Sequence, residues 1–116
     1  MILGAFSDQT LIGIAGVGRE SLLKQRHKAF IRGMYVEPAH RSNGVGRLLL
    51  STALAVLQDR PQIKLVTLVV TASNHAAIAL YRSLGFQEYG REPHALLVNG
   101  TYHDDVFMSR PIDLAP

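Results

Sequence analysis

The middle of the chain carries a strand pattern, a glycine-rich loop and a helix pattern in direct succession. Residues 29–36 alternate in part between apolar and polar, and Pro38 ends this strand because proline has no N–H for a sheet ladder. From Val45, apolar residues recur at helical spacing until Pro61. Residues 65–70 are a nearly unbroken apolar run, which is typical of a strand covered on both faces. This order predicts a right-handed crossover between two parallel strands.

The loop between the first strand and the helix has the sequence Arg41-Ser42-Asn43-Gly44-Val45-Gly46-Arg47. The backbone N–H groups at a helix N-terminus, together with the positive end of the helix dipole, make an anion site that suits phosphate. Gly44 and Gly46 let the backbone come close to a ligand, and the two arginines add positive charge. Taken alone, this motif has a second interpretation, since glycine between a strand and a helix often marks only a turn.

The predicted helix has six apolar positions on one side. Before the central strand, helix and strand, the sequence pattern predicts antiparallel strands. Residues 2–6 and 11–17 predict a hairpin, and the polar, basic residues 18–27 predict a loop or a partial helical turn. The apolar positions of the helix are Val45, Leu48, Leu49, Ala53, Val56 and Leu57.

A second helix and a closing hairpin follow the buried strand. Ser73 and Asn74 are good helix N-caps, and an apolar stripe from residue 77 to 84 stops at Gly85. A further strand begins at residue 86, with an interruption around residues 90–93. Asn99-Gly100 between two strand patterns is a strong signal for a type I′ hairpin turn.

Length and composition limit the classes of protein to consider. With 116 residues there is room for one domain, covering residues 1–116. No apolar run approaches the roughly 18 residues that cross a membrane, and the first residues lack the basic region of a signal peptide. The absence of cysteine excludes disulfides, thiol nucleophiles and thiolate metal sites, and it suits a cytoplasmic location. Twelve basic against nine acidic residues, without interleaved aromatics, favour a small polyanionic ligand over nucleic acid.

Three motifs together resemble one family. The segment from Val36 to Leu49 resembles the acetyl-coenzyme A loop of the GNAT acetyltransferase superfamily, whose pattern is Arg or Gln, two residues, Gly, one residue, and Gly or Ala. The segment from Asn74 to Phe86 resembles the later family motif with Leu-Tyr and Gly-Phe. The closing hairpin looks like the last two strands of the family, through Tyr102, Asp104, Asp105 and Met108. The resemblance covers nearly the whole chain and implies an α/β fold with a mixed sheet.

The resemblance also implies how a coenzyme would bind. The pyrophosphate would lie on the N–H groups of residues 42–47 beside Arg41, and the pantetheine arm would run between the strand that ends at Val36 and the strand at residues 65–70. A backbone N–H near Tyr35 would polarise the thioester carbonyl. Asn74 has two open interpretations, a contact to the coenzyme arm or a helix N-cap alone. The implied coenzyme contacts are Met34, Tyr35, Val36, Arg41, Ser42, Asn43, Gly44, Val45, Gly46, Arg47 and Asn74.

Two residues are candidates for proton transfer. Tyr81 falls where the family often has its general acid, and with pKa values of about 10 for tyrosine and about 8.5 for a thiol, protonation of the leaving thiolate is uphill by only ~2 kcal/mol. Its alternative role is a core aromatic. Glu37 is the candidate general base, because an alkyl amine with a pKa of about 10.4 must lose a proton at a cost of ~4.6 kcal/mol at neutral pH. Its alternative is a solvated loop carboxylate. The five histidines show no metal-ligand spacing, so we predict no metal.

The chain departs from the family at its beginning. A domain of this superfamily usually starts with a strand and one or two helices that form much of the acceptor pocket, whereas this chain starts at the first hairpin. The acceptor half would then be missing, supplied by another chain, or replaced by the loop 18–27. We expect apolar sheet surface to be left uncovered, and therefore a homodimer.

The leading functional hypothesis is an acetyl-CoA dependent N-acetyltransferase acting on a primary amine of a small molecule, peptide or protein. The alternative is a non-catalytic module that binds an acyl-CoA or a partner. Neither hypothesis involves nucleic acid or a membrane.

Overall fold

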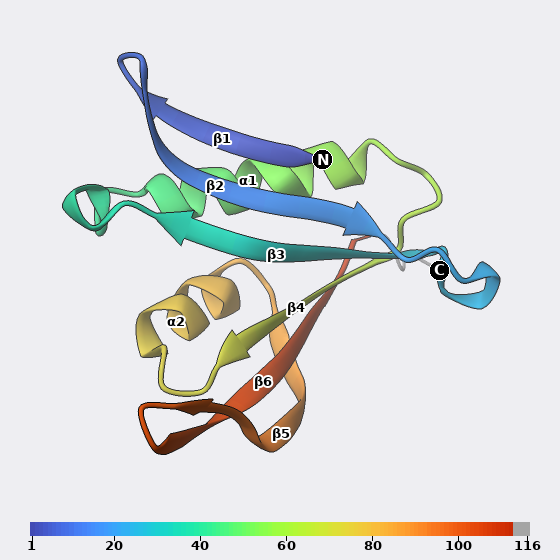
Figure 1. Cartoon of the computed structure of the whole chain (residues 1–116). Helices are drawn as coiled ribbons and strands as arrows, with labels where there is room; N and C mark the ends of the chain where they lie inside the picture. Colours follow the sequence, from blue (N-terminus) through green and yellow to red (C-terminus); the bar gives the residue numbers. More distant parts are fainter. Residues whose placement is uncertain (113–116) are drawn as a thin grey trace.

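The computed structural model describes residues 1–112, and its elements confirm the predicted order. The sheet has six strands in the order β1-β2-β3-β4-β6-β5 (Figure 1). None of the helices in the described part of the chain is long and apolar enough to span a bilayer. The elements are β1 (Ile2–Ser7), β2 (Thr10–Arg19), the short 3-10 helix η1 (Leu23–Gln25), β3 (Lys28–Val36), η2 (Pro38–His40), α1 (Val45–Gln58), β4 (Leu65–Thr71), α2 (His75–Ser83), β5 (Gln87–Val98) and β6 (Thr101–Pro111).

Strands β3 and β4 are parallel, as the predicted crossover requires, but they pair over only part of their length. Residues 28–30 pair with residues 65–67, and beyond this point the two strands diverge (Figure 1). β3 carries a bulge where it leaves β4, since Gly16 lies opposite Arg32 and Ile14 lies opposite Tyr35, and Gly33 there has a φ of 62°. A bulge bends its strand, so this one turns the end of β3 away from β4.

Both helices contribute to one hydrophobic core on one face of the sheet. Helix α1 begins at Val45 as predicted, but the predicted position of Leu48 on its buried stripe is wrong, because Leu48 is 62% exposed. Leu50 and Leu54, which the predicted stripe omits, are buried instead. The helix is rotated so that positions one and four residues apart meet the sheet, which places Leu48 on the solvent side. The buried residues of α1 are Leu49, Leu50, Ala53, Leu54 and Leu57.

β4 is covered on one face only, which corrects the prediction of a strand covered on both faces. Val66, Leu68 and Val70 are buried toward the helices, whereas Val69 is 54% exposed. α1 and α2 lie on the same side of the sheet, and within residues 1–112 no element packs against the other side. The apolar run in this segment therefore does not by itself show that both faces are covered.

The turns that the sequence predicts are present. Asn99 and Gly100 have φ values of 51° and 77°, as a type I′ turn requires. The side chain of Asn74 accepts a hydrogen bond from the N–H of Ala77 and caps α2, and Gly85 follows the helix with a φ of 93°. The expected interruption of β5 consists of two irregularities in its pairing with β6, between residues 88 and 90 and between residues 92 and 96. Residues 113–116 lie outside the described residues.

Candidate functional site

A cavity of about 650 Å³ lies where the end of β3, the start of α1 and α2 meet. β3 supplies one wall, the glycine-rich loop with the first turn of α1 supplies the end, and α2 supplies the other wall. The lining residues are Met34, Tyr35, Val36, His40, Arg41, Ser42, Gly44, Gly46, Arg47, Asn74, Ala76, Ala77, Leu80 and Tyr81.

The glycine-rich loop presents backbone N–H groups at the end of this cavity. Gly44 is the N-cap of α1 with a φ of 81°, a left-handed conformation that favours glycine. The first helical hydrogen bond of α1 runs from the N–H of Leu48 to the carbonyl of Gly44 at 3.0 Å, so within the described chain the N–H groups of residues 45–47 have no acceptor. A Cβ on Gly46 would lie 3.4 Å from the side chain of Leu80, so glycine keeps this end of the cavity open. The loop therefore has the features of an anion site.

Two arginines border the loop, and both are held by hydrogen bonds. The Nε of Arg41 donates to the carbonyl of Val36 at 3.0 Å, and the guanidinium lies 5.5 Å from the ring centre of Tyr35. The Nη2 of Arg47 donates to the hydroxyl of Ser83 at 2.8 Å, which ties α1 to the end of α2. The positive charges predicted for this site are therefore positioned on either side of the loop.

Tyr81 is the buried residue of α2, and its hydroxyl reaches the wall formed by β3. The side chain is 8% exposed, and the hydroxyl lies 3.8 Å from the sulfur of Met34, a weak acceptor. Its ring packs edge-on against Phe86 with ring centres 6.1 Å apart. Burial raises the pKa of Tyr81 above its ordinary value. The hydroxyl thus keeps its proton at neutral pH and has no strong acceptor within the described residues.

Glu37, the candidate base, is not among the residues that line the cavity. It follows β3, its side chain is 44% exposed, and its Oε1 lies 3.8 Å from the Nδ1 of His40. His40 does line the cavity, which the sequence did not indicate. Its position directly before Arg41 is the signal that could have found it, because both residues line the cavity.

Most of the predicted coenzyme contacts come together in this cavity, and two do not. Asn43 and Val45 lie in the loop but do not line the cavity. Asn74 lines it while its side chain caps α2, so the predicted cap is confirmed and a coenzyme contact stays a prediction. Ala76, Ala77 and Leu80 also line the cavity and were not predicted as site residues, although Ala77 and Leu80 belong to the same apolar stripe as Tyr81.

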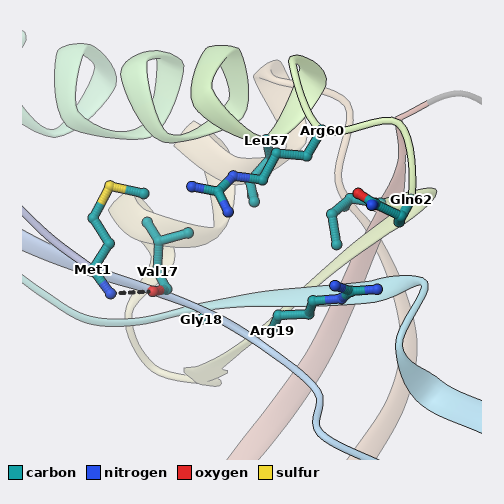
Figure 2. Close-up of a pocket in the computed structure, with 8 residues that line it drawn as sticks. Met1, Val17, Gly18, Arg19, Leu57, Arg60 and Gln62 are labelled. Carbon is teal, nitrogen blue, oxygen red and sulfur yellow. Dashed lines mark hydrogen bonds between the residues drawn. The ribbon is translucent and has the colours of Figure 1, made fainter. Parts of the chain in front are cut away.

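A second cavity, of about 320 Å³, lies at the other end of α1 (Figure 2). Arg60 and Arg19 border it, and the N-terminal amino group of Met1 donates to the carbonyl of Val17 at 2.9 Å beside it. Because this is the C-terminal end of the helix, carbonyl groups rather than N–H groups point outward there. It lacks the glycine-rich loop, so we assign the function to the larger cavity. No group of three or more His, Asp or Glu side chains within residues 1–112 could hold a metal ion.

Comparison with known proteins agrees with this assignment. Residues 1–86 match the model of the Acetyltransferase (GNAT) family. The N-alpha-acetyltransferase RimI of Mycobacterium tuberculosis is 38% identical over 101 residues, which cover 84% of this chain and 59% of that protein. The chain therefore spans about six-tenths of the length of this relative.

Solved structures share the fold. The ribosomal-protein-S18-alanine N-acetyltransferase of Escherichia coli matches with a TM-score of 0.87 and 28% identity, covering 100% of this chain and 71% of that one. The protein yncA of Salmonella typhimurium, solved with its cofactor acetyl-CoA, matches with a TM-score of 0.87 and 27% identity, covering 99% of this chain and 66% of that one.

Proposed function

Because the chain belongs to the GNAT family of acetyltransferases, we propose that it is an N-acetyltransferase that moves an acetyl group from acetyl-CoA to a primary amine. One observation carries the proposal: a single cavity joins an anion-binding helix N-terminus to a buried tyrosine hydroxyl. The loop around Gly44 and Gly46 would take the pyrophosphate of the coenzyme. The absence of cysteine suits the cytoplasm as the place of action, and this location is part of the proposal.

The proposed reaction is direct attack of the amine on the thioester. The amine nitrogen forms a bond to the acetyl carbon, the carbon–sulfur bond breaks, and the coenzyme leaves as a thiolate. The nitrogen gives up one proton to a base, Glu37 or water, so that a neutral amide remains. In the proposal, the hydroxyl of Tyr81 gives this thiolate a proton and later regains one from solvent. Burial raises the pKa of the Tyr81 hydroxyl, so the hydroxyl still carries its proton when the thiolate forms beside it.

The acceptor is proposed from the names of the relatives. The Escherichia coli neighbour is a ribosomal-protein alanine N-acetyltransferase, and the Mycobacterium tuberculosis relative is an N-alpha-acetyltransferase. Both names describe acetylation of amines on proteins or at α-positions. We therefore take a peptide with a free N-terminal amine as the first acceptor to test, ahead of small-molecule amines.

If the chain binds acetyl-CoA, the coenzyme should raise its melting temperature. Acetyl-CoA at a hundred times its dissociation constant should raise the free energy of unfolding by ~2.7 kcal/mol, a rise in Tm of several degrees. An Arg41→Ala, Gly44→Ala variant should lose most of this rise, since it removes a positioned charge and disfavours the φ of 81° at the N-cap. Arg82→Ala is the matched control, because Arg82 is exposed on α2 and does not line the cavity. A shift that survives in the loop variant would place the coenzyme elsewhere.

Glu37 gives a separate prediction about the base. If its carboxylate takes the proton of the amine, through water or directly, Glu37→Gln should lower kcat/KM by about 10-fold or more at neutral pH. The loss should shrink as the pH rises toward the pKa of the amine, because less amine then needs deprotonation. Measuring kcat/KM against pH for both forms is the check. An unchanged profile would leave Glu37 as a partner of His40 alone.

The alternative is a module that binds acyl-CoA without turnover. The observation in its favour is that Glu37, the candidate base, does not line the cavity. It would show the thermal shift with acetyl-CoA but release no free thiol with any peptide or small amine. We rank it second, since the cavity also brings Tyr81 next to the proposed coenzyme path.

A further inference from the structure

The three methionines of the chain lie in three different surroundings. Met1 is 54% exposed, and Met108 is 0% exposed inside the core. Met34 is partly buried and lines the cavity of about 650 Å³ at the end of β3. Because the chain has no cysteine, methionine sulfur is the group that a mild oxidant such as hydrogen peroxide attacks first.

The bulge in β3 brings Met34 to this cavity. Ala29 and Ile31 are buried toward the helices, so strict alternation along the strand would bury residue 33 next. The bulge instead shifts the alternation by one residue, and Met34 packs against the core. The sulfur is therefore on the helix side of the sheet, in the wall of the cavity.

The side chain of Met34 lies on the proposed path of the coenzyme. Its sulfur is 3.8 Å from the hydroxyl of Tyr81 on α2. Its terminal methyl group is 3.9 Å from the point that a Cβ on Gly46 of α1 would occupy. Met34 thus stands between the anion-binding loop and the tyrosine hydroxyl, where the coenzyme arm would pass.

The hydroxyl of Tyr81 is a buried donor with a weak acceptor. The side chain is 8% exposed, and within residues 1–112 the sulfur of Met34 is its hydrogen-bond partner. A thioether sulfur accepts hydrogen bonds weakly, whereas oxidation to the sulfoxide adds a polar oxygen. An oxygen on this sulfur can lie between the sulfur and the hydroxyl, within hydrogen-bond distance of the hydroxyl. Oxidation of Met34 would therefore give Tyr81 a strong acceptor inside the protein.

We propose that Met34 is an oxidation site through which peroxide switches off acetyl transfer. The sulfur attacks one oxygen of hydrogen peroxide, the O–O bond breaks, and the released hydroxide takes up the proton of the transferred oxygen as water. Sulfur loses two electrons and peroxide gains two, which leaves methionine sulfoxide. The sulfoxide oxygen then accepts the hydrogen bond of Tyr81 in place of the leaving thiolate. A thiol-dependent methionine sulfoxide reductase reverses the change.

Peptide mapping by mass spectrometry tests the oxidation without any assay of turnover. Hydrogen peroxide should add one oxygen to Met34 in the native chain, and excess acetyl-CoA should slow this reaction several-fold because the coenzyme arm covers the sulfur. Met1 should be oxidised at the same rate with and without the coenzyme. Met108 should stay unmodified while the chain is folded, because its side chain is out of reach.

The effect on turnover rests on the proposed function and is measured after the peroxide has been removed. Oxidation of Met34 should lower kcat by about 10²-fold or more, and the reductase should restore it. Met34→Leu, compared with its own untreated form, should lose no activity on treatment. Met34→Gln, whose amide oxygen imitates the sulfoxide oxygen, should be slow without peroxide and unaffected by the reductase. In Tyr81→Phe, oxidation of Met34 should lower the remaining turnover little further, because the hydroxyl is absent.

The outcomes that contradict the switch differ from those that contradict the acetyl transfer. An unreactive Met34, full turnover of a chain oxidised at Met34, or an equal loss in Met34→Leu would overturn the switch. Circular dichroism of the treated chain shows whether the fold is kept, and activity lost only together with the fold would overturn it too. Absence of turnover before treatment would reject the acetyl transfer and the switch together, while protection of Met34 by acetyl-CoA would still show that the coenzyme binds there.

Discussion

Replacing Tyr81 with phenylalanine is expected to lower kcat by about 10²- to 10⁴-fold while the dissociation constant of acetyl-CoA stays nearly unchanged. The substitution removes one oxygen and keeps the ring that packs against Phe86. The hydroxyl has only the sulfur of Met34 as a neighbour, so its loss strands no strong hydrogen-bond partner. The fold should be preserved, and the effect should fall on the proton transfer alone.

The pH dependence separates an acid from a structural aromatic residue. A general acid must be protonated to act, and burial moves the pKa of Tyr81 upward. Loss of its proton therefore limits the native enzyme only above about pH 10, and activity should rise with pH below that limit as the amine deprotonates. Single-turnover release of free thiol with an amine peptide measures the step, and isothermal titration measures binding. Equal turnover in Tyr81→Phe would remove the hydroxyl from the mechanism.

The order of elements could be predicted from the sequence because local signals specify it. Pro38 follows the end of the central strand, and Pro61 follows the end of the helix. Asn99-Gly100 favours a type I′ turn, because this turn needs a positive φ at both central residues. The loop with Gly44 could be placed for the same reason, since an anion site at a helix N-terminus is built from backbone and short-range geometry. These features depend on neighbours in the sequence.

Positions that depend on packing could not be predicted in the same way. The exposure of Leu48 and Val69 depends on which side of the helix or strand packs against the rest of the molecule. Because both elements carry apolar residues on both sides, the sequence does not show which side is buried. Glu37 and His40 show the same limit at the site. Both follow β3 closely, but the 3-10 turn η2 directs only His40 to the cavity. Such a turn changes the direction of the chain within three residues, so spacing alone does not show which side chain reaches the ligand.

Truncation of Phe86 is expected to give the largest loss of stability among single substitutions near the site. Phe86 is 1% exposed and is among the largest fully buried side chains of the chain, directly after Gly85 where α2 ends. Phe86→Ala should lower the free energy of unfolding by about 3–5 kcal/mol, because it loses apolar burial and leaves a cavity. A domain of this size has about 5–15 kcal/mol in total, so Tm should fall by roughly 10–20 °C.

Phe86 also links stability to the proposed catalytic group, because its ring holds one side of Tyr81. Phe86→Leu keeps most of the volume, so it should cost less stability than Phe86→Ala but still loosen the tyrosine ring. Leu23→Ala is the control, since Leu23 is 81% exposed and its truncation should change the free energy of unfolding by less than about 0.5 kcal/mol. Urea unfolding measures all three. A lower kcat for Phe86→Leu, measured at a temperature where the variant is fully folded, would show that the reaction depends on how the Tyr81 ring is positioned. An unchanged kcat would show that Tyr81 protonates the thiolate without support from the Phe86 ring.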